Sequence, residues 1–222
     1  MNISPIAYIR TEFPEKFGIP RQSGLADNLQ ARIVFEPEYR NPDALRGLLG
    51  FSHIWLIWEF SANRQAQWQP TVRPPRLGGN EHMGVFATRS PFRPNPLGLS
   101  CVKIDSIEQD PVDGPVILVC GADLMDGTPI YDIKPYIRYA DSVPEAVCGY
   151  VDNLDESRLQ VILPEMLADK IGQASEALLQ VLSLDPRPSY HDDPARIYGM
   201  SFAGHNVKFT VSQGVLTVVQ ID

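Results

Sequence analysis

The sequence lacks the short signatures that would assign it at once to a common enzyme class. It contains no Gly-x-Gly-x-x-Gly after a strand, which argues against a Rossmann-type nucleotide site, and no phosphate-binding Gly-x-x-x-x-Gly-Lys-[Ser/Thr] loop. The Gly-x-Ser-x-Gly of α/β hydrolases and the His-Glu-x-x-His of zinc peptidases are also missing. Dinucleotide oxidoreductases, P-loop NTPases and these two hydrolase classes are therefore not predicted.

Cysteine and long hydrophobic runs are scarce as well. The three cysteines form no Cys-x-x-Cys pair and the four histidines have no metal-ligand spacing, so we expect neither a disulfide framework nor a metal site. The most apolar stretch, residues 51–60, is too short to cross a bilayer, and the first residues do not resemble a signal peptide. We expect a reducing, cytoplasmic location without membrane attachment.

Proline and glycine are abundant, with 20 and 16 residues, and they divide the chain into short pieces that favour strands over a helical bundle. Strand-like segments occur at residues 3–9, 31–35, 51–60, 97–107, 115–121 and 130–137, and a short helix is expected after Asn41. Farther along we expect a strand at 158–163, a helix from Pro164 and a hairpin of 207–211 with 215–221. The prediction is a mainly β chain with some α, divided into residues 1–143 and a small α+β domain at 144–222.

The net charge of −8 argues at first against a nucleic-acid partner, since phosphate binding needs positive potential. The charge is unevenly spread, however. Residues 60–103 carry six basic side chains and one acidic one, a net +5 that leaves −13 for the rest of the chain. Five of the six are arginines, which suit bidentate phosphate contacts, so this basic segment is either a phosphate-binding surface or a chance collection of loop charges.

Residues 84–100 form the most specific stretch, because three prolines stiffen it. Pro91, Pro94 and Pro96 push the residues before them toward extended conformations. In such a segment Arg89 and Arg93 would lie about 12 Å apart, so we expect them to serve different partners. The alternative is a rigid connector with surface arginines.

Residues 123–136 combine a turn with a polar strand. Asp126-Gly127 is a turn signal, and Asp132 and Lys134 lie one strand period apart, on one face. The segment could supply functional carboxylates. It could equally be a hairpin turn followed by an edge-strand ion pair.

Together these segments resemble the TrmO (TsaA-like) family of S-adenosylmethionine-dependent tRNA methyltransferases, in its bacterial branch. The resemblance is dense over residues 1–140 and continues into the second domain. It is carried by Pro20-Arg21-Gln22, Phe51-Ser-His-Ile-Trp55, Pro74-Pro-Arg76, Gly84-Val-Phe-Ala-Thr-Arg-Ser-Pro-Phe-Arg-Pro-Asn-Pro-Leu-Gly-Leu99, Asp126-Gly-Thr-Pro129, Asp132-Ile-Lys-Pro-Tyr136, Asp185-Pro-Arg-Pro-Ser-Tyr190 and Tyr198-Gly-Met-Ser-Phe-Ala-Gly204.

The resemblance implies a single-sheet antiparallel β-barrel that works as a homodimer, with the cofactor S-adenosylmethionine near the subunit interface. The implied substrate is tRNA carrying N6-threonylcarbamoyladenosine (t6A) at position 37, mainly threonine tRNA, which is methylated on N6. The cofactor-binding residues that it implies are Pro20, Arg21, Gln22, Ser61, Ala62, Arg89, Leu99, Leu124, Met125, Asp126 and Gly127.

Methyl transfer to the weakly nucleophilic, urea-like N6 needs a positioned proton acceptor. Asp126 or Asp132 is the expected acceptor, with Lys134 or Tyr131 orienting the substrate. Arg89 is expected to meet the cofactor carboxylate. The residues expected to bind RNA are Arg73, Arg76 and Arg93. The alternatives are a non-enzymatic RNA- or ligand-binding barrel and a methyltransferase that acts on a non-RNA substrate.

Overall fold

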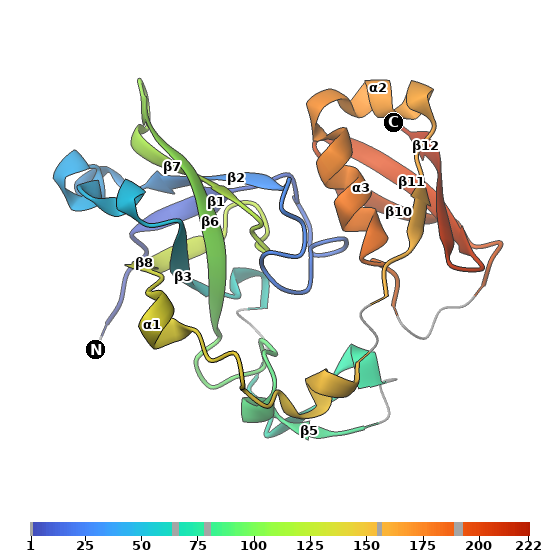
Figure 1. Cartoon of the computed structure of the whole chain (residues 1–222), viewed down its shortest axis with the longest axis horizontal. Helices are drawn as coiled ribbons and strands as arrows, with labels where there is room; N and C mark the ends of the chain where they lie inside the picture. The colour runs from blue at the N-terminus through green and yellow to red at the C-terminus, as the bar shows by residue number, and fades with distance from the viewer. Residues whose placement is uncertain (1, 64–66, 78–80, 155–156, 189–192) are drawn as a thin grey trace.

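The computed structural model describes residues 2–63, 67–77, 81–154, 157–188 and 193–222, and it contains two main β-sheets (Figure 1). The first sheet is antiparallel throughout and has the order β1-β2-β7-β6-β3-β8. Because β8 also pairs with β1, its hydrogen-bonded order closes on itself. Its strands are β1 (Ala7–Arg10), β2 (Gln30–Phe35), β3 (His53–Glu59), β6 (Leu97–Asp110), β7 (Gly114–Cys120) and β8 (Pro129–Pro135).

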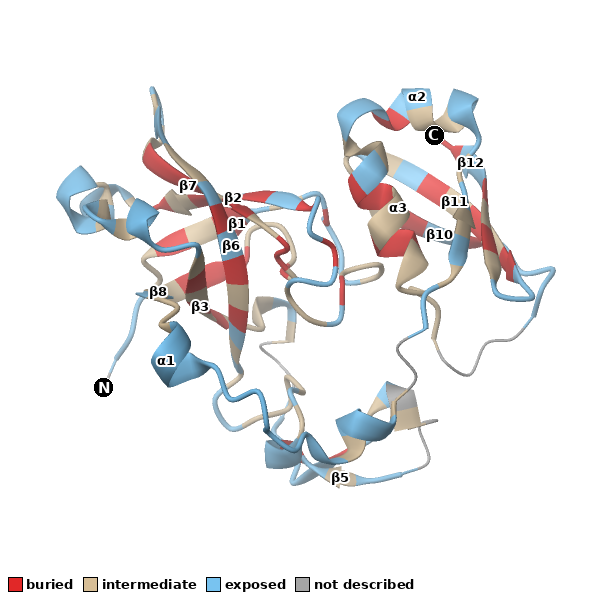
Figure 2. Cartoon of the chain, in the orientation of Figure 1, coloured by how far each residue is buried: buried red, intermediate tan, exposed pale blue. Residues whose placement is uncertain are grey.

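Alternation along these strands builds the first core. In β3, Ile54, Leu56 and Trp58 are buried while the residues between them are half-exposed, which is the period-two pattern of a strand with one face inward. The same core includes Ile9, Ile33, Val102, Ile117, Val119 and Ile130. Figure 2 shows these buried segments in red along the strands. The inward face of β6 ends near the polar Ser100, which is also buried.

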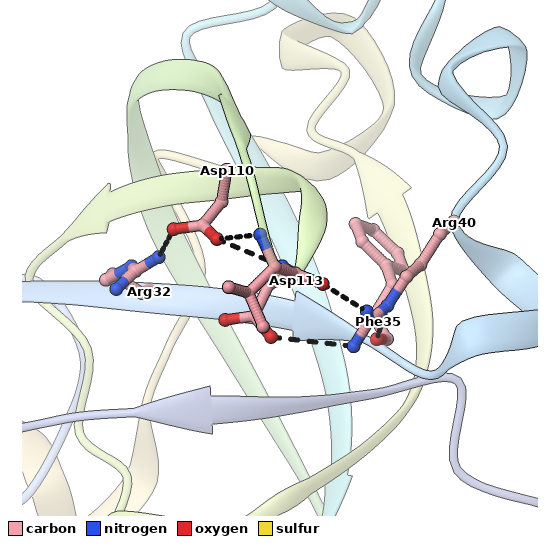
Figure 3. A network of polar contacts seen from close by, with 6 residues as sticks. Arg32, Phe35, Arg40, Asp110 and Asp113 are labelled. Atoms are coloured by element: carbon pink, nitrogen blue, oxygen red, sulfur yellow. Dashed lines mark hydrogen bonds and ion pairs between the residues drawn. The ribbon is translucent and has the colours of Figure 1, made fainter.

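A polar network holds the tight turn between β6 and β7 (Figure 3). Arg32 donates to Asp110 at 2.9 Å, and Asp110 also accepts from the backbone N–H groups of Asp113 and Val112. These backbone hydrogen bonds hold the pKa of Asp110 below its ordinary value. Arg40 donates to the Val112 carbonyl at 2.9 Å, so two arginines, Arg32 and Arg40, stabilise the turn.

The second sheet has the order β10-β11-β12-β9, with β9 parallel to β12, and two helices pack against it. These elements are β9 (Gln160–Ile162), α2 (Glu165–Ile171), α3 (Ser175–Ser183), β10 (Tyr198–Phe202), β11 (His205–Ser212) and β12 (Val215–Ile221). Leu178, Val181 and Leu182 of α3 are buried against it. The smaller elements of the chain are β4 (Thr71–Val72), β5 (Met83–Gly84) and α1 (Arg138–Asp141).

The connection between β1 and β2, residues 11–29, joins two strands of the first sheet but packs into the core of the second. Phe13, Ala26 and Leu29 are buried in the hydrophobic core of the second sheet, where the Phe13 ring meets Phe202 edge to face at 5.4 Å. Gly18 lies so close to Met200 that a Cβ there would sit 2.7 Å from the Met200 sulfur. In Figure 2 this connection, with its red stretches, lies between the first sheet and helix α3. The position of this loop is therefore set by the C-terminal residues.

The expected mainly β fold with some helix is confirmed, and several local expectations change. The helix expected to run on from Pro164 is broken at Gly172, which has a φ of +60° and separates α2 from α3. The helix after Asn41 is a 3₁₀ turn, Pro42–Leu45. Strand β10 was not expected. Among the described residues, no helix is long and apolar enough to cross a membrane.

Candidate functional site

A pocket of about 440 Å³ opens beside the end of β3, a volume suited to a cofactor-sized ligand. Four segments far apart in the sequence meet there: the β1–β2 connection, residues 58–63, residues 88–99 and residues 123–128. Its lining residues are Lys16, Ile19, Pro20, Arg21, Gln22, Trp58, Glu59, Phe60, Ser61, Ala62, Asn63, Thr88, Arg89, Pro91, Arg93, Leu97, Gly98, Leu99, Asp123, Met125 and Thr128.

One wall of the pocket carries a hydrogen-bonded chain that ends on a carboxylate. Trp58 Nε1 donates to Ser100 Oγ at 2.9 Å, and Ser100 Oγ donates to Asp123 Oδ1 at 2.6 Å. Gly98 faces Trp58 across the β3–β6 pair, and a Cβ at Gly98 would lie 2.3 Å from the indole ring. Glycine is thus required for the indole to lie flat against β6.

The carboxylate of Asp123, which lines the pocket, has a shifted pKa. Burial raises the pKa of Asp123 above its ordinary value, although the Ser100 hydrogen bond and the charge of Arg89 act in the opposite direction. A carboxylate with a raised pKa is a stronger base than a solvent-exposed one, and such groups gather at functional sites.

The pocket also carries cationic side chains. Arg89 donates to the side-chain oxygen of Gln22, and Lys16 donates to the Ala62 carbonyl at 3.1 Å. Arg21 donates to the backbone carbonyl of Asp185, which ties this wall to the C-terminal residues. The pocket therefore offers both cations for a carboxylate and a carboxylate for a cation or a proton.

Most of the residues expected to bind the cofactor meet in this pocket. Those that line it are Pro20, Arg21, Gln22, Ser61, Ala62, Arg89, Leu99 and Met125. Leu124 is buried in the first core instead. Asp126 and Gly127 form the turn before β8, where Asp126 accepts from the Thr11 backbone N–H at 3.1 Å and lies 3.7 Å from Arg10.

The residues expected to act in catalysis lie apart from the pocket. Asp132 forms an ion pair with Lys134 at 2.9 Å, and both side chains are about half exposed, at 46% and 61%. The sequence left an ion pair open as an alternative, on an edge strand; the pair is present, but β8 is not an edge strand, because it pairs with both β3 and β1. Tyr131 reaches the pocket indirectly, because its hydroxyl donates at 2.7 Å to Glu59, which lines the pocket.

The arginines expected to bind RNA are dispersed. Arg73 lies on the exposed surface beside β4 and donates to His82 at 3.0 Å. The side chain of Arg76 lies outside the described residues. Arg93 turns inward: it donates to the carbonyls of Val85 and Thr88 at 3.1 and 2.7 Å, so it holds the loop before it in place.

Sequence reasoning missed Asp123, Ser100, Trp58 and Glu59. One signal was available, because Ser100 shares a strand face with Val102 and Ile104, and a polar residue at an inward position calls for a buried partner. Among the described residues, no group of three or more histidine, cysteine, aspartate or glutamate side chains could hold a metal ion.

Comparison with known proteins assigns the chain to a family. Residues 8–142 match the tRNA-methyltransferase O N-terminal domain, and residues 156–222 match the TrmO C-terminal domain. A tRNA (adenine(37)-N6)-methyltransferase of Escherichia coli K12 is 36% identical over 98% of this chain and 96% of its own length. A protein of the same name from Eikenella corrodens is 47% identical over 76% of this chain and 95% of its own length.

A solved structure supports the same family assignment. The crystal structure of TrmO from Pseudomonas aeruginosa superposes with a TM-score of 0.81 at 32% identity, covering 100% of this chain and 98% of that one. Both domain profiles, in order along one chain, and the fold over its full length lead to the same assignment. The chain belongs to the TrmO family.

Proposed function

We propose that this protein is a tRNA methyltransferase that transfers a methyl group from S-adenosylmethionine to N6 of adenine 37. The observation that carries this conclusion is the full-length match to tRNA (adenine(37)-N6)-methyltransferases, in a chain whose described residues form a pocket lined by several of the motifs that carry the resemblance. We further propose that the substrate adenine carries the threonylcarbamoyl group, mainly in threonine tRNA.

The residues of the pocket fit S-adenosylmethionine. Arg21, Arg89 and Lys16 supply cations for its carboxylate, while Glu59 supplies negative charge for its ammonium and sulfonium groups. The apolar lining includes Phe60, Pro91, Leu97 and Leu99, which suits an adenine ring. When bound, the cofactor supplies an electrophilic methyl group.

The chain itself must align the acceptor nitrogen with that methyl group, exclude water and accept a proton. The cofactor-binding set proposed here consists of Pro20, Arg21, Gln22, Ser61, Ala62, Arg89, Leu99 and Leu124–Gly127. Asp126 and Asp132 stay predictions as proton acceptors, with Lys134 and Tyr131 as orienting groups. Methyl transfer at the wild-type rate by both Asp126→Asn and Asp132→Asn would exclude these two carboxylates.

We propose that Arg73 and Arg76, in the basic segment of residues 60–103, contact tRNA phosphates. The logarithm of the tRNA affinity should then fall linearly with the logarithm of the salt concentration, and each phosphate contact removed should reduce that slope by about one unit. A flat salt dependence would favour a non-RNA substrate. Arg93, which holds its own loop, is the weaker candidate for such a contact.

We infer that the closed six-stranded sheet is the single-sheet β-barrel core, that residues 1–143 and 144–222 are the two domains, and that the chain is a cytoplasmic homodimer. Leu97 and Leu99 line the pocket and yet are 37% and 51% exposed, which supports a second subunit covering the cofactor site. Light scattering on the purified protein tests the dimer, and a monomer at micromolar concentration would contradict it.

One assay tests the activity. The purified protein is incubated with methyl-labelled S-adenosylmethionine and tRNA from a strain that lacks this gene, with and without the threonylcarbamoyl group. We expect label in the modified threonine tRNA and none in the unmodified one. Cofactor binding without any label would indicate a non-enzymatic binding protein, and label in both tRNAs would contradict the t6A substrate.

A further inference from the structure

We propose that Asp123 is the residue that accepts the N6 proton during methyl transfer, and that Ser100 and Trp58 are the residues that position it. This inference rests on the proposed function, because it assigns a role within that reaction. It offers a third carboxylate beside the predicted acceptors Asp126 and Asp132.

The placement of Asp123 carries the proposal. It lines the pocket together with eight of the residues expected to bind the cofactor, whereas Asp126 and Asp132 belong to structural contacts elsewhere. One of its carboxylate oxygens, Oδ1, is held by Ser100 at 2.6 Å, and Ser100 is held in turn by the indole N–H of Trp58. Both supporting side chains are buried, so the carboxylate has one fixed orientation.

Glu59 is the competing carboxylate, since it also lines the pocket. It accepts a hydrogen bond from the Tyr131 hydroxyl at 2.7 Å and stands at the end of β3. Ser100 instead reaches Asp123 from the inside of the sheet, where it shares the strand face of Gly98 and Val102. Asp123 therefore has the buried support that a general base needs, and Glu59 has a half-buried tyrosine of β8 as its partner.

The step balances with the groups already named. The N6 nitrogen forms a bond to the methyl carbon as the carbon–sulfur bond breaks, and the electron pair of that bond remains on sulfur. The N6–H bond gives its electron pair to nitrogen, and its proton passes to a carboxylate oxygen of Asp123. The protonated Asp123 then returns the proton to solvent after product release.

The local electrostatics agree with this role. Burial raises the pKa of Asp123, which strengthens its carboxylate as a base. The charged residues that line the same pocket in the described part of the chain are Lys16, Arg21, Glu59, Arg89 and Arg93. Of these, Arg89 acts on Asp123 and favours its charged form, as do the Ser100 hydroxyl and the backbone of Ser23.

The test is the single-turnover rate of methyl transfer to t6A-containing tRNA, at saturating S-adenosylmethionine and over a range of pH. Asp123→Asn should lower this rate about 10²- to 10⁴-fold, the usual contribution of a general base. Its dissociation constant for the cofactor should stay within about threefold of the wild-type value. Asp105→Asn, an exposed carboxylate on the same strand as Ser100, is the matched control and should behave as wild type.

The pH dependence of the rate distinguishes a role in proton transfer from a purely structural role for Asp123 and Ser100. In the wild type the rate should rise with pH as Asp123 ionises, and this acidic limb should disappear in Asp123→Asn. Ser100→Ala removes a hydrogen bond that stabilises the carboxylate, so the limb should move to higher pH while the protein stays folded.

Two results would overturn the inference while leaving the proposed function intact. One is Asp123→Asn with the wild-type rate, or with a loss confined to cofactor affinity. The other is disappearance of the acidic limb in Glu59→Gln but not in Asp123→Asn. Absence of methyl transfer by the wild-type protein would instead contradict the proposed function itself.

Discussion

Gly98→Ala is the substitution whose effect follows most directly from the structure. Gly98 pairs with Trp58 across strands β3 and β6, and an added Cβ would lie 2.3 Å from Cε2 and 2.4 Å from Cζ2 of the indole. No real contact is that short, so the ring must move. The ring has little room to do so, because Trp58 is only 7% exposed and its ring packs against that of Phe60, with centroids 4.4 Å apart.

The cost has two parts. Overpacking of a core site costs about 1–3 kcal/mol. Displacement of the indole also breaks its hydrogen bond to Ser100, which is worth roughly 1 kcal/mol. The free energy of unfolding should thus fall by about 2–4 kcal/mol, and the melting temperature by about 4–16 °C for a chain of this length. Affinity for S-adenosylmethionine should fall as well, because Trp58 and Gly98 both line the pocket.

The assay is urea unfolding followed by tryptophan fluorescence, together with calorimetric titration of the cofactor. Gly50→Ala is the matched control, because no atom lies within 4 Å of the added Cβ and the residue has an ordinary φ. Its unfolding free energy should stay within about 0.5 kcal/mol of wild type. If Gly98→Ala were as stable as Gly50→Ala and bound the cofactor normally, the close packing of Trp58 on β6 would be refuted.

Three further predictions concern other residues. In thermal unfolding at pH 7, Asp123→Asn should be at least as stable as wild type, because the raised pKa of Asp123 means that its ionised form destabilises the folded state. The difference in stability should vanish as the pH falls below the ordinary pKa of aspartate, where both side chains are neutral. Phe13→Ala should lower the urea-unfolding free energy by about 3–5 kcal/mol, and loss of less than about 1 kcal/mol would contradict its place in the second core. Arg93→Lys should cost about 1 kcal/mol in the same measurement, because Nη1 of Arg93 makes both bonds to the Val85 and Thr88 carbonyls and the lysine nitrogen lies one bond closer to the backbone. Unchanged stability with weaker tRNA binding would favour the phosphate contact instead.

Much of the fold could be predicted because local alternation determines it. The strand expected at residues 51–60 is observed as His53–Glu59, and the expected hairpin near the C-terminus is β11 with β12. The break at Gly172 could not be predicted, since the apolar positions on both sides keep a continuous helical spacing. The burial of Phe13 and Leu29 under the second sheet was equally inaccessible, because long-range packing leaves no periodic signal in a loop.

The residues of the candidate site likewise fall into those that the sequence could indicate and those that it could not. Residues within contiguous motifs, such as Arg21 and Arg89, could be proposed from the sequence, and the structure brings them to one pocket. Asp123 could not, because its importance depends on Ser100 facing inward from a strand 23 positions away. Asp132 looked more suitable in the sequence, yet its carboxylate pairs with Lys134 on the outer surface.

The β1–β2 connection has a consequence for how the molecule unfolds. Its residues 20–22 line the pocket while Phe13 and Leu29 are buried in the C-terminal core, so a ligand in the pocket and the packing of the second sheet stabilise the same segment. Ligand binding to the native state alone raises its stability by mass action. Saturation with S-adenosylmethionine should therefore slow amide hydrogen exchange in β10 and β11, and cutting the chain between residues 142 and 156 should leave an N-terminal piece whose Phe13 and Leu29 are exposed and whose pocket has lost one wall.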